Sequence, residues 1–106
     1  MVKIPLKQTP AQKLRVVLDG QNCTISIYYR FGATYLDLAV GNNVVETGAV
    51  CRNRASIIRR ANSLFTGSLH FVDMLGDSDP DYHLYNERYI LLYVPAGEEI
   101  PEGLRY

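Results

Sequence analysis

Carboxylates form the first group of residues whose type and spacing could do chemistry. Asp77, Asp79 and Asp81 alternate along a short segment, and Asp73 lies shortly before them. Such oxygen ligands suit a hard cation such as Ca²⁺ or Mg²⁺. The segment lacks the glycine and the glutamate of an EF-hand loop, and aspartate and proline are also ordinary turn residues. We therefore predict a loop and no cofactor; a small metal-dependent enzyme that uses the 73–81 carboxylates stays an alternative.

Two cysteines and two histidines form a second set, compatible with zinc by residue type: Cys23, Cys51, His70 and His83. The 27, 18 and 12 residues between successive members match no zinc ribbon or finger. Cys51 with either histidine could also be a nucleophile and its base, but any chain with two of each residue permits that pairing. Because both cysteines lie in apolar sequence, we predict buried, reduced thiols and neither a metal site nor a catalytic residue.

Four arginines, with no acidic residue among them, form the third group: Arg52, Arg54, Arg59 and Arg60. The aspartates gather elsewhere, at 73–81, so a net charge of zero conceals two regions of opposite charge. The arginines could be a solvated face, or they could meet Asp77, Asp79 and Asp81 of another subunit. A phosphate site is the third reading, which the lack of interleaved aromatic residues disfavours.

Composition limits the classes of protein that these residues can serve. The 106 residues have 47% hydrophobic and 21% charged side chains, as in an ordinary globular domain. Zero net charge argues against nucleic acid as a partner. The longest apolar run has the length of a strand, and the start of the chain lacks the apolar region of a secretory signal. We therefore expect no membrane partner and folding in a reducing compartment.

The elements that must position these side chains are mostly strands. Alternating apolar residues predict a hairpin over 12–30 and a second hairpin formed by 35–40 and 44–50, with polar turns between the strands. Helical spacing predicts one short helix over about 55–65, with Asn53 as N-cap and Gly67 as its stop. Strands resume at 68–74 and 88–94, separated by a polar loop, and Leu91 lies in the second of them.

This order predicts a mainly β fold: a small antiparallel β-barrel or sandwich of six to seven strands with one short helix. We expect a single β-rich domain over 1–95 and an extended C-terminal tail over 96–106. Prolines and glycines interrupt the tail, and its apolar residues have no evident place in the core. The tail could therefore lay separate anchors onto a neighbour. Its candidate anchors are Ile100, Leu104 and Tyr106.

Eight short sequence segments, taken together in their order and spacing, resemble those of the small baseplate plug proteins of contractile-tailed phages. The resemblance covers roughly residues 3–95. The segments are Ile4-Pro5-Leu6, Pro10-x-Gln12, Leu18-Asp19-Gly20-Gln21-Asn22-Cys23, Tyr35-Leu36-Asp37-Leu38, Gly48-Ala49-Val50-Cys51, Gly67-Ser68-Leu69-His70-Phe71-Val72-Asp73, Gly76-Asp77-Ser78-Asp79-Pro80 and Arg88-Tyr89-x-Leu91-Leu92-Tyr93. The family supplies no catalytic residues to carry over, and the tail lies outside the resemblance.

The resemblance implies a structural virion protein without catalysis, at the tip of the tail tube. Its partners would be other tail and baseplate proteins, namely the hub, the tube or neighbouring subunits, with several copies around the tail axis. It would be located in the tail baseplate after assembly in the host cytoplasm. A small peptide- or nucleic-acid-binding module of phage or host origin is the alternative.

Overall fold

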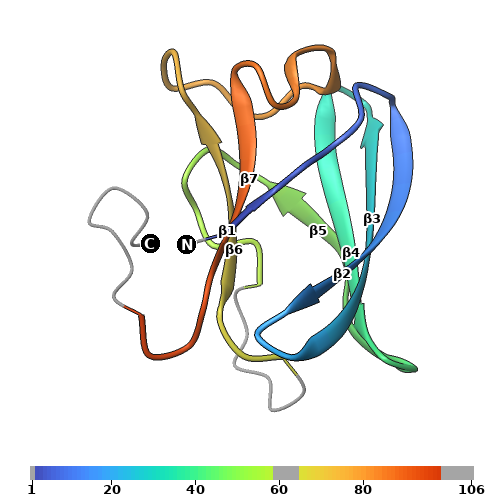
Figure 1. Cartoon of the computed structure of the whole chain (residues 1–106). Coiled ribbons are helices and arrows are strands. Elements are labelled where there is room, and N and C mark those ends of the chain that lie inside the picture. The colour runs from blue at the N-terminus through green and yellow to red at the C-terminus, as the bar shows by residue number, and fades with distance from the viewer. Residues whose placement is uncertain (1, 59–64, 99–106) are drawn as a thin grey trace.

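The computed structural model describes residues 2–58 and 65–98, which fold almost entirely into strands (Figure 1). Their order is β1 (Val2–Ile4), β2 (Ala11–Leu18), β3 (Gln21–Arg30), β4 (Ala33–Val40), β5 (Asn43–Cys51), β6 (Ser68–Asp73), a 3₁₀ turn (Tyr82–Leu84) and β7 (Tyr89–Val94). All strand pairs are antiparallel. The mainly β prediction is confirmed, and the short β1 is an addition to the predicted strands.

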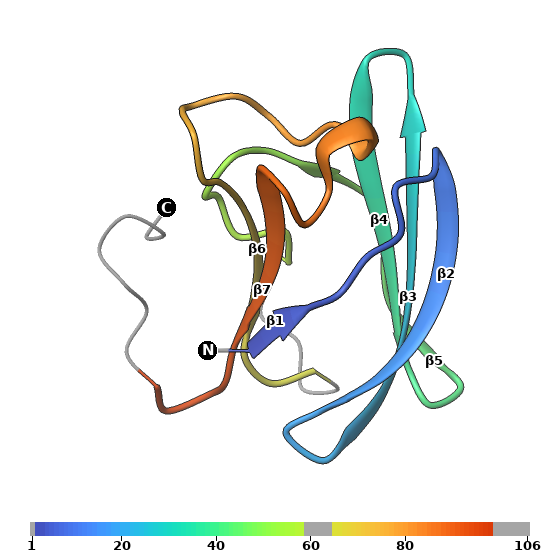
Figure 2. The ribbon, with the colours of Figure 1, turned by 45° about the horizontal axis from the view of Figure 1, so that its top comes forward.

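The strands form two sheets that share one core (Figures 1 and 2). The four-stranded sheet has the order β2-β3-β4-β5, and the three-stranded sheet has the order β1-β7-β6. The described strands do not close into a barrel. In the same part of the chain, no helix is long and apolar enough to cross a membrane.

Two-residue turns connect the first three strands of the larger sheet. The first turn lies in the predicted hairpin over 12–30, whereas the hairpin that β3 forms with β4 was not predicted. Asp19 and Gly20 join β2 to β3 with φ values of 53° and 76°, and Phe31 and Gly32 join β3 to β4 with 52° and 76°. Left-handed φ at both central residues defines a type I′ turn, whose twist matches that of the strands. The turns therefore fix the register of the sheet.

Alternation of side chains along each strand determines which residues enter the core. Cys23, Ile25 and Ile27 of β3 point inward, and Leu36 and Leu38 of β4 lie opposite them, all with at most 2% of their surface exposed. In the smaller sheet, β7 lies between β1 and β6. As predicted, β7 is a core strand, with Leu91 fully buried.

The predicted helix over about 55–65 is wrong for the part of it that can be checked before residue 59. Residues 53–57 run beside β6, where Arg54 N–H donates to the Phe71 carbonyl at 2.7 Å and Ile57 N–H donates to the Leu69 carbonyl at 2.9 Å. β6 is an edge strand, so its outer polar backbone groups need partners, and this pairing outweighs local helix propensity. Residues 59–64 lie outside the described residues.

Asn53 and Gly67 have other roles than capping a helix. The Asn53 side chain accepts a hydrogen bond from the Asp73 N–H at 2.8 Å and donates to Asp77 at 3.3 Å. Gly67 has a φ of 99°, and a Cβ there would lie 2.6 Å from the Tyr93 ring and from the Val94 carbonyl. Asn53 therefore attaches the chain after β5 to the end of β6 and to the loop that follows it. Gly67 allows the chain to pass close to β7 just before β6 begins.

Candidate docking surfaces

The structure brings the first predicted arginine and the predicted aspartates together within one chain. Arg52 Nη1 lies 3.5 Å from Asp79 Oδ2, and both side chains are more than half exposed. The next backbone N–H, of Asn53, donates to Asp79 Oδ1 at 2.9 Å. The chain after β5 is thereby attached to the loop after β6. Arg52 and Asp79 already neutralise each other in part within one chain. This pair therefore contributes less electrostatic energy to a contact between subunits than the sequence indicated.

The other predicted interface residues have different surroundings. Asp81 caps the 3₁₀ turn, accepting a hydrogen bond from the His83 N–H at 3.0 Å and facing His83 Nδ1 at 2.7 Å. Arg54 has a left-handed φ of 69° and is held to β6 through its backbone. The remaining predicted interface residues lie outside the described residues: Arg59, Arg60, Ile100, Leu104 and Tyr106.

Asp73 and Arg88 form an ion pair that the sequence did not reveal. Arg88 Nε and Nη2 each donate to one Asp73 oxygen at 2.8 Å, and the N–H groups of Leu75 and Ser78 donate to the same carboxylate. The guanidinium holds the pKa of the buried Asp73 carboxyl well below its usual range. This carboxylate organises the loop between β6 and β7, and its lone pairs are occupied by donors of the chain.

Neither of the two candidate metal sets comes together in the part of the chain that the structure describes. No group of three or more His, Cys, Asp or Glu side chains could hold a metal ion there. Cys23 and Cys51 are both buried, as predicted, and burial raises the pKa of the Cys23 thiol. His83 is on the surface, whereas His70 is fully buried. The zinc set is therefore dispersed.

The outward face of the four-stranded sheet carries a polar and aromatic cluster. The Tyr28 and Tyr35 rings stack with centroids 5.8 Å apart. Asp37 accepts hydrogen bonds from the Tyr28 hydroxyl at 3.0 Å and from the Gly48 N–H at 2.6 Å. Arg30 lies over the Tyr28 ring, 5.0 Å from its centroid. Tyrosine and arginine are enriched at protein interfaces, so this face has the composition of a docking surface.

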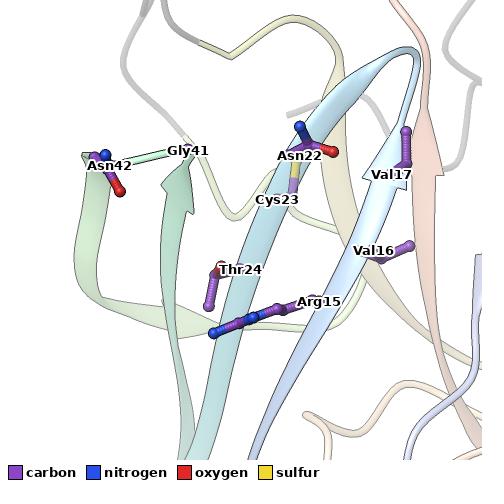
Figure 3. A pocket seen from close by; sticks show the side chains of 8 residues that line it. All are labelled: Arg15, Val16, Val17, Asn22, Cys23, Thr24, Gly41 and Asn42. Atoms are coloured by element: carbon purple, nitrogen blue, oxygen red, sulfur yellow. The ribbon is translucent and has the colours of Figure 1, made fainter.

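Open recesses lie on this same face. Figure 3 shows one of about 500 Å³, between the end of β2, the start of β3 and the turn after β4. Arg15 extends from β2 across β3 beside Thr24, with Asn22 and Asn42 on the other side of the recess. A second recess of about 550 Å³ is lined by Lys13, Ser26, Tyr28, Arg30 and Asp37, among others. Both are open hollows that polar, charged and apolar side chains line together.

A comparison with family models decides which proteins this chain belongs with. The model described as Cyanophage baseplate Pam3 plug gp18 matches residues 1–97 of the 106. The chain belongs to this baseplate plug family. The family identified from the sequence segments is thereby confirmed. A search of curated proteins gives no match.

Membership of the baseplate plug family classes the chain as a structural protein of the phage tail. The surfaces described above are consistent with that class, because they are exposed sheet faces, turns and loops. Sequence reasoning missed the outward cluster of Tyr28, Tyr35 and Asp37. The signal was present: polar and aromatic residues alternate with the apolar core residues of both strands, which places them together on the solvent side of the sheet.

Proposed function

We propose that this chain is a non-catalytic structural subunit of a contractile phage tail baseplate, where it plugs or lines the tip of the tube and contacts the central hub. The family match over residues 1–97 carries this proposal. Its partners are other tail and baseplate proteins, and several copies surround the tail axis. It assembles in the host cytoplasm and remains in the virion.

The fold supports a role in contact rather than catalysis. Among the described residues, the buried histidine has its two ring nitrogens bonded to Arg54 and Ser68, and the buried aspartate is paired with Arg88. Neither therefore faces a substrate. The exposed groups are instead an aromatic sheet face, charged segments and apolar turn residues, which suit protein partners.

Reconstruction of purified virions by electron microscopy tests this role directly. We expect density for the chain inside the baseplate, in contact with the hub at the tube tip, and loss of stable tails when its gene is interrupted. Restoring the gene on a plasmid is the control. Absence of the chain from purified virions, shown by mass spectrometry, would contradict the proposal, as would a binding partner of nucleic acid with salt-sensitive affinity.

We further propose that Arg52, Arg54, Arg59 and Arg60 form one docking face, and that Asp77, Asp79 and Asp81, although each has a partner within the chain, also contact neighbouring subunits. Like charges so close together repel one another, and an acidic partner relieves the repulsion. The double variant Arg59→Glu, Arg60→Glu should therefore fold normally but block assembly, as measured by circular dichroism and by counting intact tails.

The matched control reverses two exposed charges near the start of the chain, Lys3→Glu with Lys7→Glu. If the double variant at 59 and 60 yields as many tails as the wild type, these arginines are only a solvated face. If the control also blocks assembly, the effect belongs to net charge and not to this surface.

A further inference from the structure

Phe31 occupies a position that is unfavourable for the isolated chain in two ways. Its side chain is 100% exposed, at the tip of the hairpin between β3 and β4. Its backbone has a φ of 52°, a left-handed conformation that asparagine, aspartate and glycine adopt far more readily than a bulky residue. The other type I′ turn has Asp19 at the same position with a φ of 53°, which is the ordinary solution. Folding alone therefore gives no reason for phenylalanine here.

The hairpin that carries Phe31 is held firmly at its base. Thr34 Oγ1 donates to the Pro80 carbonyl at 2.8 Å, and the Tyr29 ring meets the Tyr82 ring edge-on with centroids 5.4 Å apart. The hairpin and the segment 74–88 lie at the same end of the molecule (Figures 1 and 2). That segment adds exposed apolar side chains, namely Met74, Leu75 and Leu84. The phenyl group is thus presented on a supported turn at an end with further apolar surface.

A cation adjoins this apolar tip. Arg30 directly precedes Phe31, and its guanidinium lies over the Tyr28 ring. Within residues 2–58 and 65–98, Arg30 makes no ion pair with a carboxylate. The tip therefore carries a phenyl group one residue from an arginine that forms no ion pair within the described part of the chain, and this combination is complementary to an apolar pocket with an acidic rim.

We propose that Phe31 inserts into an apolar pocket with an acidic rim on a different baseplate protein and anchors this subunit there. A second copy of the chain is the other host to test. One recess of about 170 Å³ on its four-stranded sheet has Leu38, Ala39 and Val44 together with Asp37 and Glu46, but Lys13 also lines it and would repel Arg30. Aromatic residues that fill a partner's pocket commonly dominate binding at an interface. This inference rests on the proposed baseplate role.

The first test measures the thermal stability of the isolated protein. Phe31→Asn places a residue suited to the left-handed turn at the tip, so we expect its melting temperature to rise by roughly 4–8 °C. Phe31→Leu keeps a bulky apolar side chain and should give no such rise. Asp19→Asn is the matched control in the other turn and should change little. A lower melting temperature for Phe31→Asn would overturn the argument that Phe31 is unfavourable in the isolated chain.

The second test is a competition inside infected cells. Wild type and one variant are produced together, and mass spectrometry compares their ratio in purified baseplates with their ratio in the lysate. We expect Phe31→Asn to be depleted by roughly 30-fold, Phe31→Leu to be depleted less, and Asp19→Asn to match the wild type. Arg30→Gln, which removes the charge beside the phenyl group, should show a smaller depletion than Phe31→Asn.

Other results of the competition, or of a measurement of self-association, would contradict specific parts of the proposal. Equal incorporation of Phe31→Asn and wild type would refute the anchor, and equal incorporation of Arg30→Gln would refute the acidic rim. Self-association of the isolated wild type that Phe31→Asn abolishes would make a second copy the partner and so refute the proposal. Absence of wild type from baseplates refutes the proposed function instead, so the two failures are distinguishable.

Discussion

His70 is a buried imidazole that joins the 53–57 segment to β6. Its Nδ1 lies 2.9 Å from the Arg54 carbonyl, and its Nε2 lies 2.9 Å from Ser68 Oγ. A carbonyl only accepts, so Nδ1 carries the proton and the neutral ring accepts from the Ser68 hydroxyl through Nε2. The ring is fully buried, and this burial lowers its pKa below the usual histidine value.

The lowered pKa of His70 predicts a loss of stability on mild acidification. The unfolded chain binds a proton near pH 6.5, whereas folded His70 binds one only at lower pH, so protonation favours unfolding. The free energy of unfolding should be level above about pH 7 and fall below about pH 6.5, by at most about 1.4 kcal/mol per pH unit. Urea melts between pH 7.5 and 5 measure this slope.

Two variants separate His70 from other titrating groups in this experiment. His70→Gln should lower stability at every pH but reduce the slope between pH 6.5 and 5, while His83→Gln should keep the slope due to His70. Asp73 affects the free energy of unfolding in a different pH range. Because its pKa is lowered in the folded state, this contribution to stability falls only as the pH drops below about 4. An equal slope in wild type and His70→Gln would show that His70 is not the cause.

At the scale of elements, β7 is the strand on which the smaller sheet depends. It pairs with β1 on one side and β6 on the other, and Leu91 is fully buried in the core. Leu91→Ala should lower the free energy of unfolding by about 2–5 kcal/mol, because it removes buried methyl groups and leaves a cavity. Urea unfolding measures the difference, and Leu92→Ala, a half-buried neighbour on the other face, is the control with a smaller expected loss. A change below about 0.5 kcal/mol at Leu91 would contradict the core assignment.

Strands could be predicted from this sequence because their signal is local. Ile25 and Ile27 alternate with polar residues, and Asp19-Gly20 is a standard hairpin turn, so pattern and turn agree. The 53–57 segment was mispredicted because its structure depends on distant residues. Its partners, Leu69 and Phe71, lie more than ten positions away, and no window of sequence around residue 55 contains them.

At the scale of the whole molecule, the charged groups were predictable and their pairing was not. The sequence shows arginines near 52–60 and aspartates at 73–81, but only folding places Arg52 beside Asp79 and Arg88 against Asp73. For Phe31, the sequence shows the type of residue and the position of a turn. Only the structure shows that the turn has a left-handed φ at Phe31 and that the side chain is exposed to solvent.

We predict that the tail over 96–106 is a docking arm and not part of the folded domain. β7 ends at Val94 with strands on both sides, and the baseplate plug family model ends at residue 97. Deleting residues 97–106 should therefore change the melting temperature of the isolated domain by less than about 4 °C while reducing incorporation into baseplates. Differential scanning calorimetry and mass spectrometry of purified tails measure the two effects.

The chemistry of the tail supplies matched full-length variants for this deletion. Replacing Ile100, Leu104 and Tyr106 by serine removes the apolar anchors and should reduce incorporation as much as the deletion does. Replacing Glu98, Glu99 and Glu102 by glutamine keeps the anchors and should preserve incorporation, because separated apolar side chains, and not charge, hold an extended segment on its partner. Unfolding of the isolated domain on deletion would show that the tail belongs to the core. Undiminished incorporation of the serine variant would show that the tail is only a terminus.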